Sequence, residues 1–369
     1  MRIERATLKS NLYFKNIDFL RFVFILIVCC CHLQFGVTNL FFNGKIPLYD
    51  TLQKCFTYSW IPVEFFFIIS GFFMFLKTDF SQSFITFAKN KLIRFMPLIW
   101  FICGVWFVTN LFIPIGFCYQ ENIFSLLNIQ NVGVTFQSGD FSSSWFVSSL
   151  FWTMCFYFYL FKIAKKEWFN LITACLIFLC YTLWISNIGI HNRLENVGSL
   201  FNIGLARAFA GVGVGYFIAQ MYQKYSEKIT AFNPNITLKI LFTIAECSLI
   251  SSLIYNTCMH CMEYKNCFIL VINFVVLFIL FLIKKGYLSQ ILNNNISCFL
   301  GKNTFAIFLT HNFVISVYGI LICQKNWRFP MHHPILNLVV LFLIIIIFGI
   351  LTHYKVEIPA TKYLKEKFK

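Results

Sequence analysis

The chain has 369 residues, of which 59% are hydrophobic and only 12% are charged, and its mean hydropathy is +0.73. Soluble domains usually contain about 25% charged residues, so the composition excludes an ordinary soluble enzyme and favours a protein that crosses a membrane many times. The formal net charge of +16 does not indicate nucleic-acid binding, because most of the basic residues flank apolar segments.

Ten apolar segments have about the 17–25 residues that a helix needs to cross a bilayer. They are residues 17–36, 60–77, 95–116, 145–163, 168–187, 203–221, 237–257, 266–284, 303–323 and 334–354. The sequence therefore predicts an all-α fold, a polytopic membrane helix bundle in a single domain over residues 1–369. Most of the 30 Lys and Arg residues lie in alternate loops and the terminal segments, which predicts that both termini are cytoplasmic.

Arg21 and His32 both lie in the first apolar segment. Eleven helical residues advance about three turns and 16 Å, so the two side chains share a helix face. Ionisable groups within a membrane usually face a bundle interior and serve function. Asp18 is three residues from Arg21 and can pair with it. His32 is a candidate general base, because a neutral imidazole accepts a proton near pH 7; the alternative is a histidine hydrogen-bonded to a neighbouring helix.

Glu64, Arg207 and His311 also lie within predicted membrane segments. Glu64 is expected near the level of His32, where it either orients an imidazole or a sugar hydroxyl, or reaches water. Arg207 has no carboxylate near it in the sequence, so its partner must come from another segment. The glycine-rich run after Arg207 favours close helix packing. For His311, a structural and a functional role are both open.

A basic pair, Lys91 and Arg94, precedes the third apolar segment. Residues three apart share a helix face, and two cations so placed suit a phosphate or pyrophosphate group. The alternative is that the pair only sets the membrane topology.

The 15 cysteines lie mostly in apolar segments, where a thiol behaves as a small hydrophobic group. The run of three cysteines and a histidine at 29–32 does not predict a metal site, because consecutive helical residues point about 100° apart. Cys258, Cys261 and Cys267 flank a short predicted outer loop, where a disulfide is compatible with an oxidising compartment.

Several motifs, in this order, resemble the acyltransferase type 3 family of integral membrane proteins. They are Asp18 with Arg21-x10-His32, Phe65-Phe66-Phe67-Ile68-Ile69-Ser70-Gly71-Phe72, Lys91-x-x-Arg94-x-x-Pro97, Trp145-Phe146-Val147-Ser148, Arg207-Ala208-Phe209-Ala210-Gly211 and Ile307-Phe308-Leu309-Thr310-His311. The resemblance covers a core at about residues 14–354. Lys91 stands where the family usually has arginine, so the bidentate fork of a guanidinium is lost there.

The resemblance implies transfer of an acyl group, usually acetyl, from cytoplasmic acyl-CoA to a hydroxyl of an extracytoplasmic polysaccharide or glycolipid. The expected location is the inner (plasma) membrane of a bacterium. No metal and no C-terminal hydrolase-like extension are expected. By role, the candidate residues are His32, Arg21 and Glu64 for catalysis, Lys91, Arg94 and Arg21 for the donor, and Trp145, Ser148, Arg207 and His311 for the acceptor.

The chemistry of the donor is compatible with this arrangement. The phosphates of CoA cannot cross hydrocarbon, so they should stay at the basic cytoplasmic face while the pantetheine arm reaches inward past Arg21 to His32. His32 then either deprotonates the acceptor hydroxyl or takes the acyl group itself.

Two other functions remain open. A transporter or flippase for a lipid-linked sugar would line its pathway with the same intramembrane charges, although the sequence shows no inverted repeat of the kind common in transporters. A non-catalytic scaffold for envelope assembly would not need His32. The expected partners are membrane lipid and a glycan or glycolipid acceptor, without nucleic acid, and the oligomeric state is open.

Overall fold

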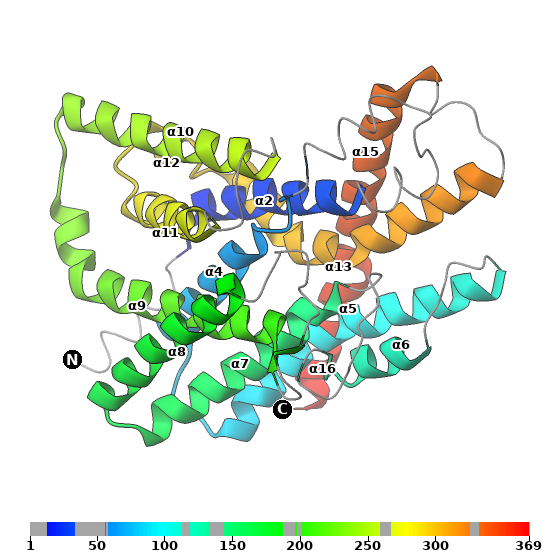
Figure 1. Ribbon diagram of the computed structural model, residues 1–369, viewed down its shortest axis with the longest axis horizontal. Helices are drawn as coiled ribbons and strands as arrows, with labels where there is room; N and C mark the ends of the chain where they lie inside the picture. The colour runs from blue at the N-terminus through cyan, green and yellow to red at the C-terminus, as the bar shows by residue number, and fades with distance from the viewer. Residues whose placement is uncertain are drawn as a thin grey trace.

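A computed structural model of the protein describes residues 13–33, 56, 58–112, 119–130, 132, 143–186, 196–197, 201–258, 267–324 and 332–368. Within these residues the chain forms helices and one short two-stranded ribbon (Figure 1). The helices are α2 (Lys15–Leu33), α4 (Val63–Lys77), α5 (Phe84–Phe112), α6 (Tyr119–Leu126), α7 (Ser144–Ile163), α8 (Lys166–Ser186), α9 (Ile203–Ala231), α10 (Ile236–Cys258), α11 (Cys267–Ile283), α12 (Tyr287–Ile291), α13 (Asn295–Gln324), α15 (Pro334–Thr352), a π-helical turn η3 (His353–Glu357) and α16 (Ile358–Lys367). Strands β1 (Asn196–Val197) and β2 (Phe201–Asn202) pair antiparallel before α9.

The predicted all-α polytopic bundle is confirmed, and each of the ten predicted segments holds a helix. Seven of the described helices are long and apolar enough to cross a membrane, counting α15 to α16 as one, and α11 is a shorter apolar helix. The 15 residues of α4 span about 22 Å, less than a hydrocarbon core of about 30 Å. Membrane crossing by α2, α4 and α11 stays a prediction.

Helices α4 and α9 pack closely because each carries glycine at the contact. A Cβ atom at Gly71 would lie 2.4 Å from the carbonyl oxygen of Val212, and one at Gly215 would lie 2.2 Å from that of Ile68. Any larger residue would push the two backbones apart. The close packing predicted for the glycine-rich run after Arg207 is therefore confirmed, and it sets the first turns of α4 and α9 opposite each other.

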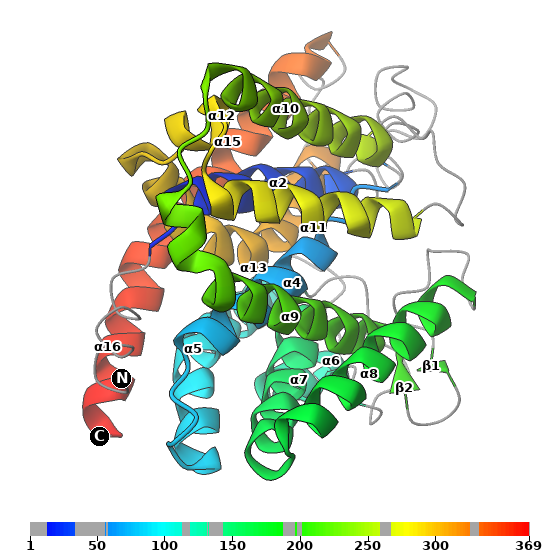
Figure 2. The same cartoon turned by 90° about the vertical axis from the view of Figure 1, so that its left-hand side faces the viewer.

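Helix α2 is held against α13 and α11 (Figure 2). A Cβ atom at Gly301 of α13 would lie 2.1 Å from Cβ of Asp18, so only glycine lets α2 approach there. On the α11 side, the Asn16 side chain donates a hydrogen bond of 2.6 Å to the carbonyl oxygen of Phe281. These contacts fix how the ionisable residues of α2 face the neighbouring helices.

The outer helices expose their apolar side chains. Helix α10 is the clearest example, because only 11% of its most apolar 18-residue stretch is buried, whereas 78% of the corresponding stretch of α9 is buried. An apolar surface of this extent is stable in hydrocarbon and not in water, so the described helices form a bundle with α9 inside and α10 at the lipid boundary.

Candidate active site

His32 of α2 meets His311 of α13 inside the bundle. Their ring centroids are 4.9 Å apart and the ring planes are inclined by 60°. His311 is buried, and its Nδ1 lies 2.6 Å from the carbonyl oxygen of Phe308. Because a carbonyl oxygen only accepts, that Nδ1 carries a hydrogen. His32 is only half-buried, so its ring can contact a bound molecule.

Arg21 lies on the same helix as His32 and is paired as predicted. Its Nη1 donates to Oδ1 of Asp18 over 3.0 Å, and the hydroxyl of Tyr13 donates to the other carboxylate oxygen. Partial burial, followed by the hydrogen bond to Asp18, raises the pKa of Tyr13, so the phenol remains a donor at neutral pH. Asp18 thus holds Arg21 while 24% of the Arg21 side chain stays exposed.

Four cations gather at the end of the bundle where Arg21 lies, and we call them the basic cluster: Arg21, Lys77, Lys91 and Arg94. Arg94 interacts electrostatically with Arg21, with Lys77 and with Lys91. The Arg94 side chain is exposed, so it can contact a bound molecule. Four cations gathered in this way suit a polyanion.

Helix α5 begins at Phe84, well before the segment predicted from residue 95. Lys91 and Arg94 therefore lie within the helix, which continues through Pro97, and they share one face as the spacing predicted. Lys77, at the end of α4, was interpreted from the sequence only as a topology determinant. Its side chain interacts electrostatically with Asp18 and Arg94, which places it in the basic cluster.

A second polar centre joins the first turns of α4 and α9. Arg207 Nε donates to Oε1 of Glu64, and the two side chains are 1% and 0% exposed. The hydroxyl of Tyr181 lies 3.5 Å from the other oxygen of Glu64. The partner of Arg207 does come from another segment. Both oxygens of Glu64 contact Arg207 or Tyr181, and the side chain is 0% exposed. The alternative in which Glu64 reaches water is therefore wrong, and its role in orienting an imidazole or a sugar hydroxyl stays a prediction.

Three tryptophans surround the Arg207 guanidinium. The distances from its central carbon to the ring centroids are 4.9 Å for Trp60, 5.1 Å for Trp184 and 5.9 Å for Trp145. Cation–π contacts of this kind stabilise a desolvated cation by about 2 kcal/mol. They explain how a full charge pair persists in the interior.

Aromatic rings connect the two polar centres. His311 lies 5.9 Å from the ring of Phe308, which lies 5.2 Å from Phe146. Phe146 is in turn 6.3 Å from Trp145, beside Arg207. A chain of buried aromatic rings, packed mostly edge to face, thus connects the histidine pair to the ion pair.

Ser148, predicted as an acceptor-binding residue, is buried and donates to the carbonyl oxygen of Asn128 over 2.9 Å. That bond ties α7 to the end of the α6 segment, so the structure gives this side chain an anchoring contact. Its neighbour in space, Trp152, donates to the same carbonyl oxygen over 2.8 Å.

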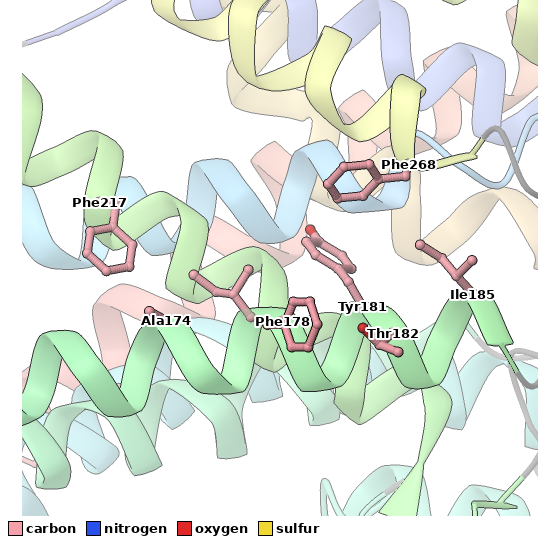
Figure 3. A pocket seen from close by; sticks show the side chains of 8 residues that line it. Ala174, Phe178, Tyr181, Thr182, Ile185, Phe217 and Phe268 are labelled. Carbon is pink, nitrogen blue, oxygen red and sulfur yellow. The ribbon is translucent and has the colours of Figure 1, made fainter.

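An apolar groove of about 420 Å³ opens on the side of the bundle between α8, α9 and α11 (Figure 3). Phe178, Phe217 and Phe268 line it, and Tyr181 stands at its inner wall. Because the Tyr181 hydroxyl lies 3.5 Å from Glu64, Tyr181 lies between this groove and the second polar centre.

Among the described residues, no group of three or more His, Cys, Asp and Glu side chains is placed to hold a metal ion. Cys29 and Cys31 are buried in the helix packing and Cys30 is half-buried. The side chains of Cys258, Cys261 and Cys267, named above for a disulfide, lie outside the described residues.

The described helices define a multi-pass membrane protein in which α2 contributes Arg21 to the basic cluster and His32 to a histidine pair. The family described as "Acyltransferase domain" matches residues 14–354. The chain therefore belongs to the acyltransferase type 3 family and is a membrane acyltransferase. No curated protein and no solved structure matches the chain significantly.

Proposed function

We propose that the protein moves an acyl group, in the simplest case acetyl, from cytoplasmic acyl-CoA to a hydroxyl of an extracytoplasmic polysaccharide or glycolipid. The observation that carries the proposal is the layout of α2: Arg21 belongs to the basic cluster at one end, and His32 meets His311 toward the other. The interval between Arg21 and His32 is about 16 Å along the helix, a distance that suits the pantetheine arm of CoA.

The donor binds through its phosphates to the basic cluster. Three phosphate groups need several cations, and Arg21, Lys77 and Arg94 supply them from three different helices. The exposed position of Arg94 lets the phosphates remain hydrated at the cytoplasmic end of the bundle. The thioester end, which is neutral, enters the apolar interior at less cost.

His32 performs the proton transfer. It removes the proton of the acceptor hydroxyl as the oxygen attacks the thioester carbon. The C–O bond forms, the C–S bond breaks, and the imidazolium returns the proton to the departing CoA thiolate. His311 has its Nδ1 fixed on the carbonyl oxygen of Phe308, so its ring is held in place against His32 and limits how the His32 ring can turn. An acyl-histidine route would use the same two rings.

The acceptor approaches on the side of the second polar centre. Trp145 and the neighbouring aromatic rings offer apolar contacts for a sugar, and Arg207, whose Nη2 makes no hydrogen bond within the described residues, offers a donor at the deep end. A protein working in this way would lie in the inner membrane of a bacterium with both termini in the cytoplasm, and its partners would be membrane lipid and the glycan or glycolipid.

The test is acyl transfer by purified protein in lipid nanodiscs, with radiolabelled acetyl-CoA and glycan from a strain that lacks the gene. Label should appear on the glycan, and the surface glycans of that strain should lack one acetyl group per modified unit by mass spectrometry. A transporter or a scaffold would leave acetyl-CoA unconsumed in the purified system.

A further inference from the structure

The last long helix changes pitch beside the basic cluster. Residues His353–Glu357 form a π-helical turn, in which the N–H of Ile358 bonds to the carbonyl oxygen of His353. A π turn inserts an extra residue into a helix, and such turns occur frequently at functional sites. Here the turn packs against α5, the helix of Lys91 and Arg94.

Contacts on both sides of the π turn fix its position. Above it, a Cβ atom at Gly349 would lie 2.5 Å from Cγ1 of Ile307, so α15 is pressed onto α13. Below it, α16 lies along α5 (Figure 2), and Lys89 donates to the carbonyl oxygen of Phe368 over 2.6 Å. Contacts of α15 with α13 and of α16 with α5 therefore hold the π turn in place beside α5.

Glu357, the last residue of the turn, is an anion beside the basic cluster. It interacts electrostatically with Arg94, and 15% of its side chain is exposed. Its hydrogen bond, however, goes to His353 within the same turn, with Nδ1 and Oε2 2.6 Å apart. The carboxylate is thus held on its own helix while it lies within electrostatic range of Arg94, a cation that the donor also needs.

We propose that Glu357 competes with the donor phosphates for Arg94, and that His353 restrains this competition by holding the carboxylate back. The inference rests on the proposed donor site. An anion near a phosphate site weakens phosphate binding, so Glu357 limits the affinity for CoA and promotes release of the CoA product after transfer. Loss of the His353 bond frees the carboxylate to turn toward Arg94.

The experiment measures the Kd of coenzyme A itself, by calorimetry on the full-length protein in nanodiscs. Glu357→Gln should bind CoA about three- to tenfold more tightly, because one repulsive charge is removed. His353→Leu should bind CoA about threefold more weakly, because the freed carboxylate then opposes the phosphates. A damaged fold does not tighten binding, so the first result has no merely structural explanation.

The double variant Glu357→Gln with His353→Leu completes the cycle. It should behave like Glu357→Gln alone, since His353 acts only through the carboxylate. Glu366→Gln, an exposed acid on α16, is the matched control and should leave the Kd unchanged. If Glu357→Gln bound CoA with an unchanged or higher Kd, the inference about Glu357 would be overturned while the proposed donor site would stand. A wild-type protein that binds no CoA would overturn the proposed donor site as well.

Discussion

His32 and His311 come from the first and the ninth predicted membrane segments, and the structure brings their rings to 4.9 Å, edge to face. The His311 ring is fixed by its hydrogen bond to the carbonyl oxygen of Phe308, and the His32 ring is half-buried. In the proposed mechanism the two histidines therefore have different tasks: His311 positions the ring of His32, and His32 transfers the proton.

His311→Gln is expected to lower kcat about 10- to 100-fold while the KM for acyl-CoA changes little. The physical reason is that a positioning residue affects the geometry of proton transfer and not the distant phosphate contacts. Initial rates at varied acetyl-CoA concentration separate the two constants. An equal rise in KM with unchanged kcat would show that His311 contributes to donor binding instead.

Lys91→Ala combined with Arg94→Ala is expected to raise the KM for acyl-CoA at least tenfold, because two cations of the basic cluster are lost. The effect should shrink at high salt, since screening already weakens the wild-type contacts. Lys224→Ala with Lys228→Ala, an exposed pair on α9, is the control for net charge. Equal effects of the two double variants would mean that the basic cluster has no special role.

Lys91→Arg is expected to lower the KM for acyl-CoA a few-fold, because a guanidinium binds phosphate through two parallel hydrogen bonds. The same kinetic assay measures it. Lys77→Ala should raise the KM for acyl-CoA and leave kcat unchanged. If Lys77→Ala left the KM unchanged, Lys77 would have to be removed from the basic cluster.

Glu64→Ala is expected to destabilise the fold by about 3–5 kcal/mol, because it leaves the Arg207 charge buried without its partner. Thermal unfolding in detergent, followed by tryptophan fluorescence, measures the loss. Glu167→Ala, an exposed acid on α8, should unfold like the wild type. Replacement of both partners, Glu64→Leu with Arg207→Met, should recover much of the stability, and a double variant no better than Glu64→Ala would contradict this account of the pair.

The ten helical segments were predictable, because length and hydropathy are local properties of the sequence. The Asp18–Arg21 pair was predictable for the same reason, since three residues of helix place the two side chains together. The pairing of Glu64 with Arg207, and of His32 with His311, depends on which helices touch. No local pattern encodes that, although the glycines of α4 and α9 indicated a close contact without naming the partner.

Other parts of the site escaped prediction for a different physical reason. The start of α5 was placed too late because Lys91 and Arg94 interrupt the hydropathy, whereas a helix continues through charged residues when their side chains stay exposed or partly exposed. The π turn that orients Glu357 depends on packing at Gly349 and Phe368, which a sequence pattern does not reveal.

The central claim is that His32 is the proton-transferring residue of a membrane acyltransferase. The most direct measurement is the rate of acetyl transfer from labelled acetyl-CoA to glycan by purified His32→Ala protein in nanodiscs, with His332→Ala, an exposed histidine, as control. We expect His32→Ala to fold normally, to bind CoA with the wild-type Kd and to lose at least about 10²-fold in rate. Wild-type transfer by His32→Ala would contradict the account.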